Sequence, residues 1–137
     1  MKDTLNSRVK HREEFRPFAG SVTEADAQEY FVISVNSPFM LLITQVRNAY
    51  RSILSPIVHI DGSVRLQTVS PEQNPRFHKL LIKFKEFTGY PILLNTSLND
   101  NGEPIISSCE DAIRFFMKSD VDYLVIDRYI IKKNYGR

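Results

Sequence analysis

The strongest hydrophobic pattern along the chain has a helical period. Five apolar residues recur every three or four positions: Phe77, Leu80, Leu81, Phe84 and Phe87. This spacing places them on one face of a helix. Asn74 and Pro75 supply an N-cap and a first-turn proline, and Gly89 supplies a C-terminal stop. The pattern therefore predicts a helix from Asn74 to Thr88 that packs one face on a core.

Other helical signals are shorter. Residues 107–110 (Ser-x-x-Glu) have the form of a capping box that opens a helix. The buried side of that helix is predicted to carry Ala112, Ile113, Phe116 and Met117. Residues 21–24 have the same form and predict a short helix over 21–31. Another short helix is predicted over 49–54, and residues 1–20 are predicted to form an irregular basic arm.

Six short apolar runs, closed by polar or turn residues, predict strands. They lie at residues 39–46, 58–60, 64–69, 91–94, 123–126 and 129–131. The first run is expected to be buried, and Asp61-Gly62 forms a turn between the second and the third. Strands that alternate with helices predict an α/β (α+β) fold. We expect a mixed sheet with flanking helices in a single domain over residues 1–137.

Composition narrows the environment and the partners of the chain. Of its 137 residues 42% are hydrophobic and 25% charged, and its apolar runs are too short to span a bilayer. No signal-peptide pattern opens the chain, and its one cysteine, Cys109, cannot form an internal disulfide. We therefore expect a cytoplasmic protein without a membrane partner. A net charge of +2 is too small to predict a nucleic-acid partner.

The familiar catalytic signatures are missing from the sequence, which has no Walker loop, GxGxxG or HExxH motif. The three histidines and Cys109 lack metal-ligand spacing, so no metal ligand is predicted. What remains includes a set of cations. Lys10, Arg12 and Arg16 lie within seven residues, and Arg65 lies in a predicted strand. Arginine can grip a phosphate with two hydrogen bonds, and lysine adds a point charge.

A second polar group follows the predicted strand at 91–94. Asn95, Thr96, Ser97 and Asn99 lie at the end of that strand, where α/β proteins usually bind ligands. Their amides and hydroxyls can donate to phosphate or carbonyl oxygens. Together with the cations, they favour binding and transfer of a phosphorylated group. The alternative is that residues 95–102 form an ordinary turn-rich loop and that the arginines are surface residues, and it stays open at this point.

Four segments together resemble one known family. They are residues 9–18 (Val-Lys-His-Arg-Glu-Glu-Phe-Arg-Pro-Phe), 59–68 (His-Ile-Asp-Gly-Ser-Val-Arg-Leu-Gln-Thr), 74–75 (Asn-Pro) and 94–104 (Leu-Asn-Thr-Ser-Leu-Asn-Asp-Asn-Gly-Glu-Pro). In order and spacing, from about Asn6 to Ile131, they are similar to the C-terminal domain of the NodU/CmcH-type O-carbamoyltransferases. Residues 10–12 (Lys-x-Arg) and 97–99 (Ser-x-Asn) also resemble paired motifs of the wider YrdC group. Glu14 departs from the family pattern, where we expect proline.

The resemblance implies a YrdC-like fold, a twisted mixed sheet with flanking helices. It implies that the domain uses carbamoyl phosphate and ATP, with Mg²⁺, to form carbamoyl-adenylate. In the family an N-terminal Kae1-like domain holds a metal ion, and there the carbamoyl group passes to a hydroxyl of a small-molecule acceptor. The chain looks like the YrdC-like half alone. We therefore expect a carbamoyltransferase domain that is incomplete in isolation and has the Kae1-like domain as its partner.

The resemblance also implies roles for nine residues. Four are expected at the catalytic centre: Lys10, Arg16, Arg65 and Ser97. Five are expected to bind substrate and nucleotide: Arg12, His59, Asn95, Thr96 and Asn99. The three cations of the first set would bind the phosphates, whose roughly four negative charges need three or four cations for neutralisation.

The remaining expected roles are more specific. Ser97 and Asn95 would hold the carbamoyl group or its adenylate, and Asn99 would support their loop. Arg12 would orient phosphate. His59, with Asp61, would order the strand of Arg65.

Two other functions remain open from the sequence. One is a nucleotide- or RNA-binding YrdC-like module without turnover, which a steep salt dependence of RNA affinity would indicate. The other is a half-domain that only completes the interface of a transferase. A well-folded chain that binds no nucleotide would indicate the latter.

Overall fold

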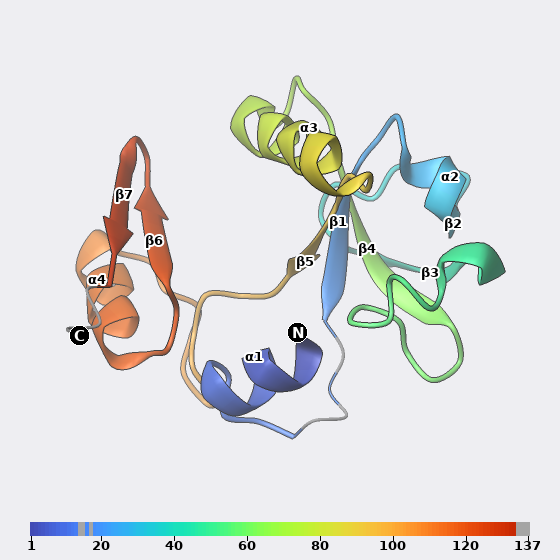
Figure 1. The fold of residues 1–137 in the computed structure, drawn as a ribbon. Helices are drawn as coiled ribbons and strands as arrows, with labels where there is room; N and C mark the ends of the chain where they lie inside the picture. The colour runs from blue at the N-terminus through green and yellow to red at the C-terminus, as the bar shows by residue number, and fades with distance from the viewer. Residues whose placement is uncertain (14–15, 17, 134–137) are drawn as a thin grey trace. The chain divides into compact units, whose positions relative to one another are not determined.

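A computed structural model of the chain describes residues 1–13, 16 and 18–133. The chain forms two compact units (Figure 1). The middle unit consists of Pro17–Thr96, and the terminal unit consists of Met1–Arg16 together with Ser97–Arg137. The middle unit contains a five-stranded sheet and the terminal unit a two-stranded sheet. Among the described residues, no helix is long and apolar enough to cross a membrane.

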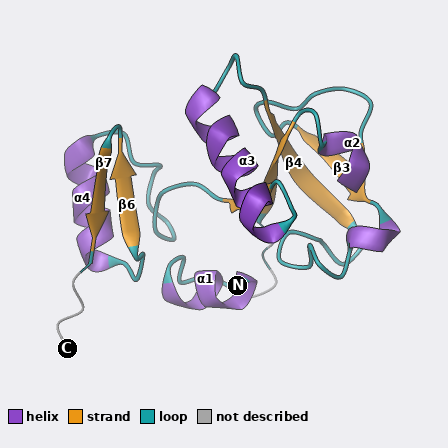
Figure 2. Cartoon of the chain, turned by 45° about the horizontal axis from the view of Figure 1, so that its top comes forward, coloured by secondary structure: helices purple, strands orange, loops and turns teal. Residues whose placement is uncertain are grey.

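The middle unit is built on a mixed sheet with the strand order β2-β3-β4-β1-β5. Its strands are β1 (Ala19–Thr23), β2 (Phe31–Val32), β3 (Leu42–Val46), β4 (Ser63–Val69) and β5 (Ile92–Asn95). β1 and β4 run parallel, and the other neighbouring pairs are antiparallel. Helix α2 (Ala27–Tyr30) follows β1, and helix α3 (Pro75–Thr88) packs against β1 and β5. Figure 2 shows α3 beside the strands of this sheet. The predicted α/β class with a mixed sheet is confirmed.

Strand β1 corrects the prediction of a helix over 21–31. All five of its residues are buried, between β4 on one side and β5 on the other. The strand is closely packed at Gly20, where a Cβ would lie 2.5 Å from Cδ1 of Ile57 and would require that side chain to shift. The Ser21 hydroxyl donates to Gln67 Oε1 across the sheet and caps no helix. The helix is confined to the single turn α2, because the segment before it is paired as a strand.

The run at 39–46 is also corrected. The strand starts only at Leu42, and Phe39 and Leu41 are 74% and 81% exposed. The run is therefore apolar without being buried. Two neighbouring predictions were wrong. A single 3₁₀ turn over Asn48–Tyr50 replaces the helix predicted at 49–54, and residues 58–60 form no strand.

Helix α3 has the predicted ends. Asn74 Oδ1 accepts a hydrogen bond from Phe77 N at 3.2 Å, and Gly89 ends the helix with φ of 85°, a left-handed conformation that favours glycine. The predicted apolar face is only partly covered. Leu81 is fully buried, whereas Phe87 at the end of the same face is exposed.

The terminal unit contains α1 (Lys2–Arg8), α4 (Cys109–Lys118), β6 (Tyr123–Ile126) and β7 (Tyr129–Lys132). The prediction that residues 1–20 are irregular is wrong for α1. This helix has no side-chain cap, so the sequence carries no cap signal for it. The β6–β7 pair is confirmed, and it forms an antiparallel hairpin. A core of Ala112, Phe116 and Leu124 joins α4 to β6.

Helix α4 starts one residue later than its predicted cap implies. The Oγ atom of Ser108, not of Ser107, accepts from Asp111 N at 3.1 Å. Phe115 is buried on this helix, whereas Ile113 and Met117, predicted to be buried, are exposed. The helix therefore turns a slightly different face to its core.

An ion pair in the middle unit joins α3 to Asp26, the residue before α2. Lys85 Nζ lies 2.7 Å from Asp26 Oδ1, and Asp26 Oδ2 accepts from the Thr23 hydroxyl at 2.5 Å. Burial alone would raise the pKa of Asp26, but the hydrogen bonds from Lys85 and Thr23 hold the pKa below its ordinary value. The folded state therefore favours the ionised carboxylate.

We predict that Asp26→Asn lowers the free energy of unfolding at neutral pH by about 1–2 kcal/mol. Because the folded pKa is depressed, this contribution is complete above the unfolded value of about 3.9 and is lost as the pH falls through the folded value. Urea unfolding should therefore separate the variant from the parent chain at neutral pH and much less at about pH 3. The matched control is Glu86→Gln, which breaks the exposed Lys83–Glu86 pair and should cost less than about 0.5 kcal/mol. Equal losses in the two variants would contradict the prediction.

Candidate functional site

The ammonium group of Lys10 connects the N-terminal segment of the terminal unit to the loop at 97–99. Lys10 is only 4% exposed. Its Nζ donates to the backbone oxygens of Ser97 (2.9 Å) and Asn99 (2.6 Å) and to Asn99 Oδ1 (2.8 Å). Since an ammonium has three protons, these contacts occupy all of its donors. Two motifs that are 87 residues apart in the sequence therefore meet at one buried side chain.

The loop held by Lys10 is also tied to itself. The Ser97 hydroxyl donates to Asn99 Oδ1 at 2.5 Å, and Asn99 Nδ2 donates to the Glu103 backbone oxygen at 2.8 Å. The amide of Ile106 donates to Leu98 O at 3.1 Å. Ser97 is exposed, but its hydroxyl is oriented by Asn99. Asn99 therefore supports the loop, as the resemblance implies.

The charges around Lys10 shift its pKa in opposite directions. Burial lowers the pKa of Lys10, the nearby Arg12 lowers it further, and Asp100 opposes both. Asp100 is held close to His11, whose Nδ1 lies 3.1 Å from Asp100 Oδ1. Hydrogen bonds from His11 and from the Asn101 amide keep the pKa of Asp100 below its ordinary value. The Asp100 carboxylate thus partly compensates the burial of a cation.

Arg12 and Arg16 lie in the same segment with different partners. Arg12 Nε donates to Asn6 Oδ1 at 2.8 Å, and the fully buried Asn6 donates through Nδ2 to Arg16 O at 3.1 Å. The Arg16 side chain forms an exposed ion pair with Glu13. Asn6, Arg12 and Glu13 also line a shallow depression of about 470 Å³ in this unit. The sequence motifs did not identify Asn6, because its bonding to Arg12 and Arg16 depends on its burial. Glu14, which departs from the family pattern, lies outside the described residues.

In the middle unit, Arg65 and Asn95 lie on one face of the sheet. Asn95 is opposite Ala19 in the β1–β5 register, and Ser21 is opposite Gln67 in the β1–β4 register. Arg65 precedes Gln67 by two positions on β4, so it points to the same face. Arg65 is exposed and forms no ion pair with any described residue.

A hydrogen-bond network orients the amide of Asn95. Nδ2 donates to Gln67 Oε1 (2.9 Å) and Ser21 Oγ (3.0 Å), and the Ser21 hydroxyl donates to the same Gln67 oxygen (2.7 Å). Gln67 Nε2 is held in turn by the Pro38 backbone oxygen at 3.1 Å. The two protons of Nδ2 are directed inward, so Asn95 Oδ1 is left as an acceptor to which no described residue donates.

The remaining predicted residues lie beside these groups. His59 precedes β4, and its backbone amide donates to Ser63 O at 2.8 Å. Asp61 Oδ1 accepts from Ser63 N at 2.9 Å, and this bonding to Ser63 lowers the pKa of the Asp61 carboxyl. The turn therefore orders the start of the Arg65 strand through its backbone and through Asp61. Thr96 is half-buried directly after β5.

The predicted site residues thus form two groups. Lys10, Arg12, Ser97 and Asn99 gather in the terminal unit, and Arg65 and Asn95 share a sheet face in the middle unit. The convergence of both groups on one ligand stays a prediction. Over the parts of the chain that the structure describes, no cluster of three or more histidine, cysteine or acidic side chains could hold a metal ion.

The five-stranded mixed sheet with its flanking helices makes the middle unit an α/β structure. Comparison with known proteins identifies the family of the chain. The chain matches the carbamoyltransferase C-terminus family over residues 1–133 and belongs to that family. The resemblance found in the sequence is confirmed.

Several relatives are similar over nearly the whole chain. It is 45% identical over 135 residues to nodulation protein NolO of Bradyrhizobium diazoefficiens, and this match covers 96% of the chain and 25% of the relative. Nodulation protein NolNO of Sinorhizobium fredii is 46% identical over 135 residues, or 96% of the chain and 20% of the relative. The 3'-hydroxymethylcephem-O-carbamoyltransferase of Amycolatopsis lactamdurans is 36% identical over 125 residues, or 91% and 24%. The chain therefore spans a quarter or less of these relatives.

We predict that Lys10→Met destabilises the loop at 97–99 and lowers the free energy of unfolding by about 1–3 kcal/mol, because the oxygens of Ser97 and Asn99 lose the donor that they share. Hydrogen exchange should speed up at the Ile106 amide, which bonds to Leu98 O inside this loop. Lys79→Met, at an exposed position of α3, is the matched control and should stay within about 0.5 kcal/mol of the parent chain. If Lys10→Met behaved like the control, the anchoring role would be wrong.

Proposed function

We propose that the chain is the carbamoyl-activating part of an O-carbamoyltransferase. It uses carbamoyl phosphate, water and ATP, with Mg²⁺, to form carbamoyl-adenylate, and inorganic phosphate and pyrophosphate are released. The carbamoyl group then passes to a hydroxyl of a small molecule, and AMP leaves. Membership of the carbamoyltransferase C-terminus family supports this function, and one relative carries O-carbamoyltransferase in its name. The observation that carries the proposal is the anchoring of the Ser97–Asn99 loop by Lys10.

The proposed roles follow from the donors and acceptors that each side chain has left. Lys10 uses its three protons on the loop, so it acts as a positioning residue and contributes charge. Arg65, which has no ion-pair partner among the described residues, binds phosphate through its planar fork. Arg12 and Arg16 contribute further positive charge in the terminal unit.

In the proposed site, Asn95 provides the selectivity for a carbamoyl group. A carbamoyl group differs from an acetyl group by an NH₂, which donates hydrogen bonds. Because Ser21 and Gln67 direct Nδ2 of Asn95 inward, Oδ1 is positioned to accept from that NH₂. The Ser97 hydroxyl is the complementary group for the carbonyl or adenylate oxygens. A polar group held in advance binds without reorganisation.

Pyrophosphate exchange tests the function directly. The 137-residue chain is incubated with MgATP, labelled pyrophosphate and carbamoyl phosphate, and label entering ATP is measured. We expect exchange that requires carbamoyl phosphate. No carbamoylated product should form from a panel of hydroxyl acceptors until the remaining part of a NolO-type relative is added. RNA affinity with a steep salt dependence and no exchange would instead indicate a binding module.

We predict that Arg65→Lys weakens carbamoyl phosphate binding about tenfold to a hundredfold, because lysine keeps the charge and loses the two-pronged contact. Calorimetric titration measures the loss, and an unchanged urea midpoint verifies folding. Arg76→Lys, at the exposed start of α3, should leave the affinity unchanged. Equal effects at both positions would remove Arg65 from the site.

We also predict that Asn95→Ala narrows the preference for carbamoyl phosphate over acetyl phosphate by about tenfold, since the acceptor for the NH₂ is lost. Competition between the two compounds in the exchange assay measures this ratio. Thr88→Ala, outside the network, is the control. An unchanged ratio in Asn95→Ala would exclude Asn95 as the group that recognises the carbamoyl nitrogen.

A further inference from the structure

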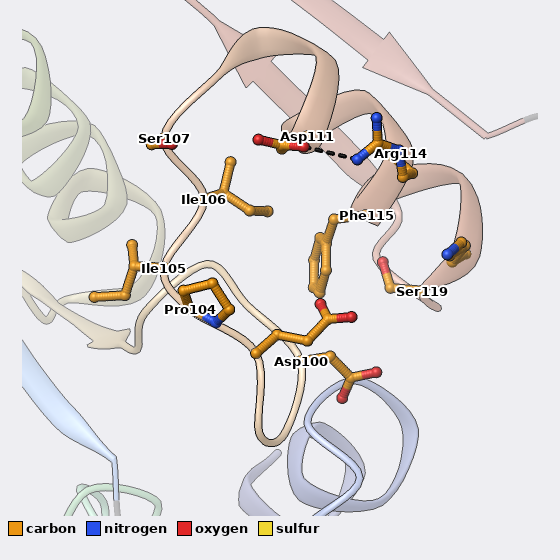
Figure 3. Close-up of a pocket in the computed structure, with 11 residues that line it drawn as sticks. Asp100, Pro104, Ile105, Ile106, Ser107, Asp111, Arg114, Phe115 and Ser119 are labelled. Carbon is orange, nitrogen blue, oxygen red and sulfur yellow. Dashed lines mark hydrogen bonds and ion pairs between the residues drawn. The ribbon is translucent and has the colours of Figure 1, made fainter.

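Neither a cavity in the terminal unit nor a loop in the middle unit has an assigned role. The cavity has a volume of about 320 Å³ and lies beside α4, where Asp111 pairs with Arg114 at 2.8 Å (Figure 3). None of the nine residues predicted for the carbamoyl site lines it. The loop, residues 37–41 before β3, contacts Asn95. Of the two features, the loop is therefore the one that bears on the proposed chemistry.

The loop at 37–41 is anchored on β4 through Ser37. Ser37 is 3% exposed, its amide donates to Thr68 Oγ1 at 2.9 Å, and its carbonyl accepts from the Thr68 amide at 3.0 Å. The backbone oxygen of the next residue, Pro38, accepts from Gln67 Nε2 at 3.1 Å. Both contacts are made to neighbouring residues of β4, so the first half of the loop has a fixed position beside Gln67.

Met40 lies in the same loop and has an unusual backbone conformation. Its φ of 55° is left-handed, a conformation that residues with a Cβ adopt rarely and at a steric cost. Such a conformation persists only where the surrounding structure holds it, and it is common at functional sites. Met40 is half-buried, whereas its neighbours Phe39 and Leu41 are exposed. The strained residue is thus the one whose side chain is directed inward.

The Met40 thioether contacts the amide of Asn95. Its Sδ lies 3.6 Å from Asn95 Nδ2, which also donates to Gln67 Oε1 at 2.9 Å and to Ser21 Oγ at 3.0 Å. A thioether sulfur accepts hydrogen bonds weakly and cannot donate them. If the Asn95 amide turned over, Oδ1 would face Sδ and Gln67 Oε1, neither of which has a proton to donate. Met40 and Gln67 therefore disfavour the same alternative orientation.

We infer that Met40 is a positioning residue for Asn95. Its thioether, directed inward by the left-handed backbone, keeps Nδ2 of Asn95 on the side of Ser21 and Gln67, so that Oδ1 is the end that meets a ligand. Through this orientation Met40 contributes to the selection of a carbamoyl group over an acyl group. The selectivity rests on the proposed function, whereas the orientation of Asn95 is a property of the free chain.

The orientation is tested first without ligand, by nuclear magnetic resonance on the full ¹⁵N-labelled chain. The parent chain should show a nuclear Overhauser effect between the Met40 methyl group and the Asn95 side-chain amide. Met40→Leu keeps the apolar volume and removes the sulfur, so the Asn95 side-chain amide protons should exchange with water at least about threefold faster. Met117→Leu makes the same change at a residue of α4 that is 70% exposed, and it should leave the exchange unchanged. Absence of the Overhauser effect, or equal exchange in the two variants, overturns the inference.

The thermal midpoint separates positioning from packing. Leucine fills nearly the volume of methionine, so the midpoint of Met40→Leu should stay within about 3 °C of the parent chain. Met40→Gly relieves the left-handed strain but removes the whole side chain, so its amide exchange should be at least as fast as in Met40→Leu. A lower midpoint with unchanged amide exchange in both variants would make Met40 a packing residue and contradict the inference.

Selectivity is tested in the pyrophosphate-exchange assay with carbamoyl phosphate and acetyl phosphate in competition. Met40→Leu should narrow the preference for carbamoyl phosphate about threefold, and Met117→Leu should not. In an Asn95→Ala background, Met40→Leu should change the ratio no further, because Met40 acts through Asn95. Additive effects in the double variant would show that Met40 acts apart from Asn95 and would refute its role. A parent chain without exchange would refute the proposed function and the selectivity together, and the amide measurement would still decide the positioning role.

Discussion

The loop at 97–99 depends on one buried charge, the ammonium of Lys10. A buried cation is costly unless its protons are accepted, and here Ser97 and Asn99 supply three oxygens for three protons. Two of these oxygens belong to the backbone, so the charge fixes the path of the chain as well as a side chain. The Ser97 hydroxyl is then oriented by Asn99, whose own position Lys10 sets. Loop geometry and buried charge are consequently one constraint.

In the middle unit, buried polar side chains are held in place by uncharged partners. Strand β1 is buried along its whole length between β4 and β5, so its polar side chains need partners inside the sheet. Ser21 finds Gln67 and Asn95 on the two neighbouring strands. A polar network of this kind is stable only when its members are satisfied, and satisfaction fixes their orientation. The amide of Asn95 therefore has a defined direction because β1 is the strand beside it.

The sequence predicts elements well where local signals and tertiary packing agree. Helix α3 has its period, its cap and its stop within the helix itself, and strands β4 to β7 end at clear turns. The signal failed at residues 21–24, because the Ser-x-x-Glu pattern of a cap also fits a buried strand such as β1, which shows no alternation. Helix α1 lacks any side-chain cap. For the candidate site, the sequence motifs located the predicted residues but not the residues that hold them in place. Asn6 and Ser21 have this role through burial and cross-strand pairing, and neither property can be read from the sequence. Gln67 was within reach, two positions after Arg65 on a predicted strand.

In the proposed function, the charge of the phosphate and the shape of the carbamoyl group are recognised by different residues. Phosphate is bound in this proposal by Arg65, which is exposed and has no ion-pair partner among the described residues. A carbamoyl group is neutral, so only the direction of its donors and acceptors can distinguish it from an acyl group of similar size. That distinction requires an acceptor that cannot turn away, since a freely rotating amide would offer either end. In the proposed site Asn95 meets this requirement, because its Nδ2 already donates to Ser21 and Gln67 before any ligand is present.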